Sequence, residues 1–131
     1  MLPARHRLRT AADFSATLRG AGAARSGGRL LVIAGRYAMP ADVARDAADR
    51  PARVGFVVSK AVGGAVTRNR TKRVLRHLVA DRLNRIPQGS DLVVRANPAA
   101  AEASTAELAA ELDRALDVVL RRLRSPAGAS S

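Results

Sequence analysis

The sequence predicts a mixed α/β sandwich, in which a small sheet carries helices packed on one side. Short runs of branched apolar residues, typical of strands, alternate along the chain with longer amphipathic stretches, typical of helices. The chain has 131 residues, of which 47% are apolar, enough for a single domain with a modest core. We therefore expect one domain over residues 1–123. A disordered tail is expected over 124–131, where the chain ends in SPAGASS.

The first half of the chain predicts a short helix followed by strands. Thr10 can cap the helix, and Gly20 ends it. Branched residues cluster at 29–38 and again at 53–60, which indicates two strands. The stretch ARSGG at 24–28 fits either a turn or a further short strand.

The second half predicts a helix, a strand and a final helix. The first helix is expected over about 66–86, and a strand over 90–96. The final helix, over 104–123, has apolar residues at helical spacing. Ser104 and Glu107 at its start have the spacing of a capping box. If the strands on either side of the first of these helices are parallel, the usual preference is for a right-handed crossover.

Positive charge is concentrated in two blocks. The formal net charge is +12 and the sequence pI is about 11.8. Residues 1–36 carry a net +6 and residues 53–85 a net +8, while the rest of the chain nearly balances. Two basic blocks on an otherwise balanced chain indicate a binding surface for a polyanion rather than a general solubilising charge.

Composition excludes several classes of site. The chain has no cysteine, which excludes disulfides, thiolate metal sites and cysteine nucleophiles. The longest apolar runs, such as LLVIA, are too short to span a membrane, and the N-terminus lacks the apolar core of a secretory signal. These features predict a soluble, cytoplasmic protein with no membrane partner.

The expected helix over 66–86 has two distinct faces. At about 100° per residue, one face is formed by Thr71, Val74, Leu75 and Leu78. The opposite face is cationic and contains Arg68, Asn69, Lys72, Arg73 and Arg76, with Arg70 at its flank. No acidic residue lies between Arg53 and Asp81, so these cations have no partners on their own helix. This favours a phosphate-binding face over a merely solvated one.

No constellation of residues predicts catalysis by the chain itself. His6 and His77 are far apart in sequence, and the acidic residues cluster away from the basic stretch. The segment AVGGAV lacks the ending of a phosphate-binding loop. We therefore expect no catalytic residue and no metal site in this chain.

Two stretches of the sequence resemble a known family. SKAVGGAVTRNRTKRVLR at 59–76, together with LPARHRLRTAADFSATLRGAG at 2–22, is similar to the protein subunit of bacterial ribonuclease P. The resemblance implies an α+β fold, a two-layer αβββαβα sandwich with a four-stranded sheet. It also implies a left-handed β-α-β crossover, as in a domain of ribosomal proteins, which is the opposite of the general preference.

The resemblance also implies a function. Members of this family hold the catalytic RNA subunit and precursor tRNA, one protein per RNA. The RNA, with bound Mg²⁺, acts as the endonuclease that removes the 5′ leader from precursor tRNA by hydrolysis. The residues implied to bind the catalytic RNA are Lys60, Arg68, Asn69, Arg70, Lys72, Arg73 and Arg76. Those implied to line a cleft for the single-stranded leader are Phe14, Leu18, Leu30, Val32 and Phe56.

Several alternatives stay open at this point. Phe14 could stack on a nucleotide base or belong to the core, and Phe56, on the strand expected over 53–60, could face either the cleft or the core. A ribosomal or rRNA-maturation protein could carry a similar basic domain. A DNA-binding helix-turn-helix is disfavoured, because the basic helix follows a strand rather than a second helix.

Overall fold

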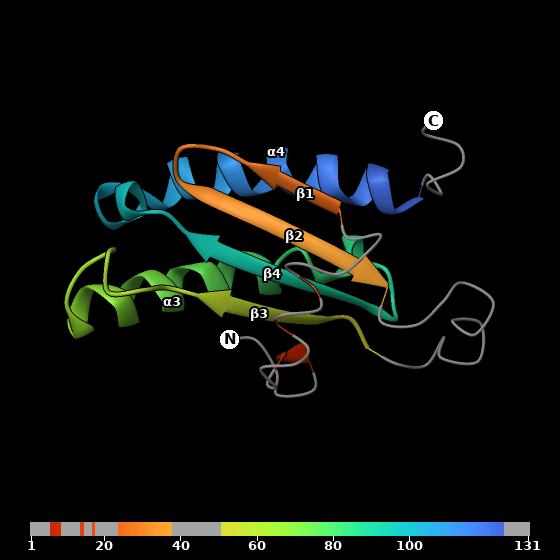
Figure 1. The fold of residues 1–131 in the computed structure, drawn as a ribbon, viewed down its shortest axis with the longest axis horizontal. Coiled ribbons are helices and arrows are strands. Elements are labelled where there is room, and N and C mark those ends of the chain that lie inside the picture. Colours follow the sequence, from red (N-terminus) through yellow and green to blue (C-terminus); the bar gives the residue numbers. More distant parts are fainter. Residues whose placement is uncertain (1–5, 9–13, 15–16, 18–23, 38–50, 125–131) are drawn as a thin grey trace.

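The computed structural model describes residues 6–8, 14, 17, 24–37 and 51–124. The strands are β1 (Ala24–Gly27), β2 (Leu31–Tyr37), β3 (Arg53–Val57) and β4 (Ser90–Ala96), and the long helices are α3 (Ala65–Ala80) and α4 (Thr105–Arg124) (Figure 1). Short 3-10 helices follow α3 at Leu83–Arg85 and β4 at Pro98–Glu102. Of the tail predicted over 124–131, Arg124 is instead the last residue of α4, and residues 125–131 lie outside the described residues, as do the predicted helix ends Thr10 and Gly20. Phe14 and Thr17 are both at helical positions, as expected of the first helix.

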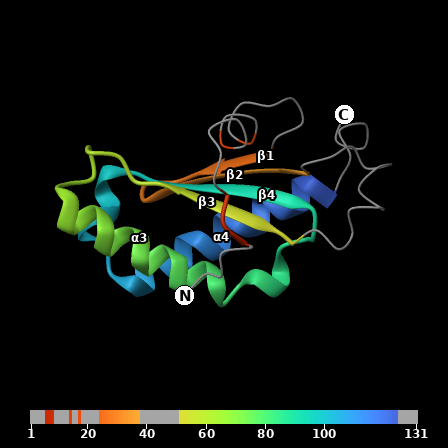
Figure 2. The ribbon, with the colours of Figure 1, turned by 90° about the horizontal axis from the view of Figure 1, so that it is seen from below.

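The strands form one four-stranded mixed sheet in the order β1-β2-β4-β3. β2 pairs antiparallel with both β1 and β4, whereas β3 and β4 are parallel. Both long helices cover one face of this sheet, so the helices and the sheet make two layers (Figure 2). The predicted α+β sandwich is therefore confirmed.

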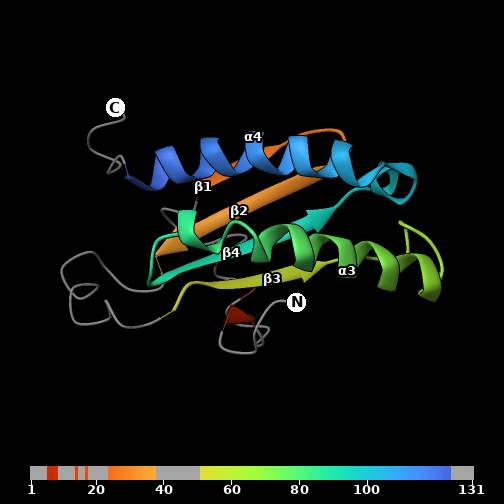
Figure 3. The same ribbon diagram turned by 180° about the vertical axis from the view of Figure 1, so that it is seen from behind.

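The connection from β3 through α3 to β4 is left-handed. With the helices toward the viewer, as in Figure 3, both strands run to the right and β4 lies above β3. The general preference for right-handed crossovers is thus wrong for this chain, and the handedness that the resemblance implies is confirmed. The handedness decides which face α3 covers. A right-handed turn between the same two strands would place α3 on the face opposite α4.

The core fills the space between the sheet and the two helices. Leu31, Ile33, Leu92 and Val94 come from the central strands and are at most 2% exposed. From the helices, the buried apolar residues are Leu75, Leu78 and Val79 of α3 and Leu108, Leu112, Ala115, Leu116, Val119 and Leu120 of α4. Thr71 and Leu75, predicted to face inward, are buried, and Val74 is half-buried against the core. The apolar face of the basic helix is therefore confirmed.

Gly35 allows α4 to pack closely on β2. A Cβ atom at this position would lie 2.4 Å from Leu92 Cδ2 and 2.9 Å from Val119 Cγ1. Both distances are shorter than van der Waals contact, so any side chain here would force the helix away from the sheet.

The element boundaries agree with the sequence to within two residues except at two ends: the strand expected over 53–60 ends at Val57, and one helix ends early. The strand over 90–96 and the capping box are confirmed: Ser104 N–H donates to Glu107 Oε1 at 2.9 Å, and Glu107 N–H donates to Ser104 Oγ at 3.1 Å. The stretch at 24–28 is a strand rather than only a turn. The helix expected to reach residue 86 instead ends at Ala80. Just beyond this end, Arg82 turns toward α4 and donates to Asp113.

Candidate nucleic-acid interface

The cations of the basic motif lie on the outer side of α3 and at its entrance. Lys60, Asn69, Arg70 and Arg73 are exposed, while Arg68, Lys72 and Arg76 are half-buried. Over the described ranges of the chain, no carboxylate lies within ion-pair distance of any of these cations. Their charges are therefore available to an anionic partner.

The start of α3 also favours an anion. Its N-cap residue is Gly64, so no side chain caps the helix, and its first turn contains no acidic residue. The uncapped N–H groups and the positive end of the helix dipole lie beside the cationic motif. Arg68 Nε is buried and has no hydrogen-bond partner in the part of the chain that the structure describes.

Other arginines of the same basic block have a structural role. Arg53 is paired with Asp91, Arg82 with Asp113, and Arg85 with both Asp113 and Asp117. The hydrogen bond from Arg82 lowers the pKa of Asp113, to which Arg85 adds a smaller effect. The same hydrogen bond raises the pKa of Arg82.

These pairings divide the block by role. Of the nine basic residues between positions 53 and 85, three are neutralised by carboxylates outside the block. The remaining six are the cations of the motif. The segment charge alone could not distinguish the two groups, because the acidic partners follow the block in sequence.

A cleft of about 320 Å³ opens along the edge of β3. Its lining comes from the N-terminal segment, from β3 and from α3: Arg7, Leu8, Phe14, Val54, Gly55, Phe56, Lys72 and Arg76. Two aromatic rings and three cationic side chains therefore share one depression. Lys72 and Arg76 belong to both the cleft and the basic motif, so the cleft lies directly beside the cationic side of α3.

Phe14 packs on β3 at the one position of that strand that has no side chain. A Cβ atom on Gly55 would lie 2.3 Å from Phe14 Cζ, so the ring rests on the glycine backbone. Phe14 is half-buried and still lines the cleft. The ring thus packs on the sheet and also lines the cleft, while its stacking on a nucleotide base stays a prediction.

The other residues predicted for the cleft lie elsewhere. Leu30 is 4% exposed and belongs to the core shared with α4, so its assignment to the cleft is not supported. It follows the turn between β1 and β2, where the Glu111 carboxylate accepts its N–H at 2.7 Å and holds it inward. Val32 is half-buried on β2 and does not line the cleft. Leu18 lies outside the described residues.

Four cleft residues were missed from the sequence: Arg7, Leu8, Val54 and Gly55. Leu8 N–H donates to the Val54 carbonyl at 3.0 Å, and Arg7 forms a parallel bridge with Val54. His6 Nδ1 lies 2.7 Å from the Ala52 carbonyl oxygen. The N-terminal segment thus covers the outer edge of β3 and brings Arg7 into the cleft. A bridge of so few residues has no periodicity that could predict it.

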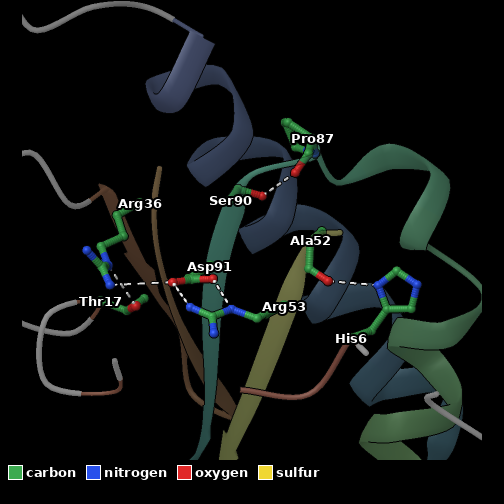
Figure 4. A network of polar contacts seen from close by, with 8 residues as sticks. All are labelled: His6, Thr17, Arg36, Ala52, Arg53, Pro87, Ser90 and Asp91. Carbon is green, nitrogen blue, oxygen red and sulfur yellow. Dashed lines mark hydrogen bonds and ion pairs between the residues drawn. The ribbon is translucent and has the colours of Figure 1, made fainter. Parts of the chain in front are cut away.

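Phe14 and Thr17 lie on the face of the sheet opposite the two long helices. Thr17 Oγ1 accepts a hydrogen bond from Arg36 Nε at 3.2 Å (Figure 4). Phe14 covers Gly55. The sequence predicted helices on one side only. The structure instead places helical residues on both faces, with the cleft where the second face meets the β3 edge.

The arrangement suits binding to a nucleic acid strand better than catalysis. Aromatic rings can stack on bases while cations contact phosphates. Within the described ranges, no group of three or more His, Cys, Asp or Glu side chains could hold a metal ion. Asp91 and Asp113 are engaged by arginines, and Glu111 accepts the backbone N–H groups of Leu30 and Leu31, so these carboxylates are not grouped into a site that fits Mg²⁺. No helix of the described part of the chain is both long and apolar enough to cross a membrane.

Comparison with known proteins identifies the family. The family profile described as Ribonuclease P matches residues 2–120. The chain belongs to the ribonuclease P protein family. The ribonuclease P protein component of Kocuria rhizophila is 50% identical over 122 residues, covering 93% of this chain and 98% of that protein. The component from Acidothermus cellulolyticus is 53% identical over 117 residues, covering 88% of this chain and 89% of that protein.

Solved structures of ribonuclease P proteins share the fold. The Staphylococcus aureus protein matches with a TM-score of 0.71 at 24% identity, over 87% of this chain and 97% of that one. The Thermotoga maritima protein matches with a TM-score of 0.65 at 24% identity, over 88% of this chain and 96% of that one. The chain is thus a protein component of ribonuclease P, the enzyme that matures the 5′ end of tRNA, and acts within a ribonucleoprotein. Of the two functions that the sequence left open, the family match supports this one over a ribosomal role.

Proposed function

We propose that the protein binds the catalytic RNA through the outer side of α3 and the single-stranded 5′ leader of precursor tRNA through the cleft at the β3 edge. The observation that carries the proposal is the composition of the cleft, in which Phe14 and Phe56 lie with Lys72 and Arg76. A flexible single strand is bound by rings that stack on its bases and by cations that contact its phosphates. Binding of this kind depends little on the nucleotide sequence.

α3 would serve both RNAs from different sides. Lys72 and Arg76 are one turn apart and line the cleft, whereas Asn69, Arg70 and Arg73 are exposed and do not. The cleft side would hold the leader, and the exposed side would contact the catalytic RNA. This arrangement would keep the leader next to the RNA that cleaves it, by binding and orientation alone.

Cleavage itself is assigned to the RNA. Since the described residues offer no metal-binding cluster, we assign Mg²⁺ mainly to the RNA subunit and no catalytic residue to this chain. The positive charge of α3 would reduce phosphate repulsion between the two RNAs. One protein per RNA and a cytoplasmic location stay predictions of the sequence.

The proposal is tested by the contribution of Phe14 to substrate selectivity. The full-length protein is reconstituted with ribonuclease P RNA, and Kd is measured for a precursor tRNA and for the mature tRNA. Phe14→Ala is expected to reduce the preference for the precursor by about 1–3 kcal/mol, the contribution of one stacked base. Binding to mature tRNA should be nearly unchanged. If the variant keeps the wild-type preference, the cleft does not bind the leader.

A further inference from the structure

An ion-pair network around one buried carboxylate lies on the sheet face opposite the long helices. Asp91 of β4 is fully buried, and its register neighbours are Arg36 of β2 and Arg53 of β3. Arg53 donates to both carboxylate oxygens of Asp91, through Nε and Nη2, at 3.0 Å each. Arg36 Nη2 donates to Asp91 Oδ2 at 3.4 Å. Figure 4 shows the two guanidinium groups approaching the carboxylate from the two neighbouring strands.

The network continues from the sheet to the segment that carries Phe14. The same Arg36 donates through Nε to Thr17 Oγ1, and Thr17 is fully buried. Thr17 follows Phe14 by three residues, and both are at helical positions, so their side chains are directed to the same side of the helix. A chain of hydrogen bonds therefore runs from Asp91 through Arg36 to Thr17, one turn away from the ring that lines the cleft.

The backbone of Gly55 beneath Phe14 does not by itself fix where the ring lies along β3. Gly55 presents bare backbone, which supplies contact area but no side chain to set the position of the ring along the strand. Apolar contact is not directional, whereas hydrogen bonds require defined distances and angles. The polar network can thus fix what the packing of Phe14 on Gly55 leaves free.

We propose that Asp91, acting through Arg36 and Thr17, is a positioning site that holds Phe14 at the cleft and thereby sets the selectivity for the precursor leader. The inference rests on the proposed function of the cleft. Asp91, Arg36 and Thr17 do not themselves line the cleft, so they act only by placing the ring. A network with a merely structural role would change stability without changing selectivity.

The test changes only Thr17, the residue of the network that lies one helical turn from Phe14. Thr17→Val keeps the shape of the side chain and removes its hydroxyl, while Thr17→Ser keeps the hydroxyl and serves as the control. Each full-length variant is reconstituted with ribonuclease P RNA, and Kd for precursor and mature tRNA is measured together with the melting temperature of the protein. Thr17→Val is expected to lower the precursor preference roughly 3- to 10-fold, the net contribution of one hydrogen bond. Thr17→Ser should keep the wild-type preference.

Phe14→Ala provides the second arm of the experiment. If Thr17 acts through Phe14, Thr17→Val should cause no further loss of selectivity in a Phe14→Ala background. A further loss there would reveal a general structural effect and overturn the inference, whatever the melting temperatures. If Thr17→Val alone keeps full selectivity while Phe14→Ala loses it, the positioning role is wrong but the leader cleft stands. If Phe14→Ala itself has no effect, the proposed function of the cleft fails.

Discussion

The division of the arginines into paired and unpaired groups makes a quantitative prediction about salt dependence. Arg73 is exposed and has no ion-pair partner among the described residues, whereas Arg85 is paired with Asp113 and Asp117. Replacing either arginine by alanine lowers the formal charge by the same single unit. The two variants are therefore matched in net charge and differ only in whether the removed charge was available to RNA.

The magnitude follows from counterion release. Each phosphate neutralised by a cation contributes about −0.7 to −0.9 to the slope of log K against log salt. Arg73→Ala should therefore reduce the magnitude of the slope for ribonuclease P RNA by about 0.7–0.9, and the double variant with Arg68→Ala by roughly twice that. Arg85→Ala should change the slope by much less, because its charge is already compensated within the protein.

The assay is equilibrium binding of the full-length protein to ribonuclease P RNA over a series of monovalent salt concentrations at constant Mg²⁺. Circular dichroism of each variant checks that the fold is retained. Equal slopes for Arg73→Ala and Arg85→Ala would mean that binding depends on net charge alone. The reasoning that α3 makes direct phosphate contacts would then be refuted.

Two further predictions concern the stability of the fold. Gly35→Ala should lower the free energy of unfolding in urea by about 1–3 kcal/mol, because its Cβ would overlap Leu92 and Val119. Gly64→Ala, whose Cβ would meet nothing within 4 Å, is the control and should cost about 1 kcal/mol or less; an equal loss in both would argue against the close approach of α4 to β2. For Asp113→Asn we expect a loss of about 0.5–1 kcal/mol at pH 7, since the pair with Arg82 is partly exposed. Because the folded-state pKa of Asp113 is lowered, its contribution is present above the unfolded value of about 4 and is lost as the pH falls through the folded value. The unfolding curves of wild type and variant should therefore converge on acidification, and a gap that persists in acid would contradict the assigned role of the ion pair.

The sequence by itself determined the local elements and the two faces of α3. The strand over 90–96 and the capping box of Ser104 and Glu107 depend on neighbouring residues, and both are found as predicted. Leu75 is buried and Arg73 exposed because the periodicity of a helix assigns them to opposite sides. The absence of carboxylates on the helix itself already indicated that its cations lack partners there.

The composition of the cleft was only partly predictable. Phe14 was expected there from the family resemblance, and Phe56 could have faced the cleft or the core; both line the cleft, and Phe56 also packs against the core. Arg7 was not expected, because it reaches the cleft through a bridge to Val54, 47 positions away in sequence. Leu30 was assigned to the cleft, but Glu111 of α4 holds its backbone and turns the residue into the core. Neither contact has a local signal in the sequence.

Only the tertiary structure decided which arginines hold the fold and which are left for RNA. Arg53 meets Asp91, and Arg82 meets Asp113, across separations of 38 and 31 residues, which no local pattern encodes. The handedness of the crossover was likewise undetermined by local sequence. Because the crossover from β3 through α3 to β4 is left-handed, the apolar face of α3 shares one core with α4, and the opposite face of the sheet remains available to Phe14 and Thr17. The cleft forms where the two long helices on one face of the sheet and Phe14 on the other meet the edge of β3. This arrangement depends on long-range packing, which the propensity of a single segment does not determine.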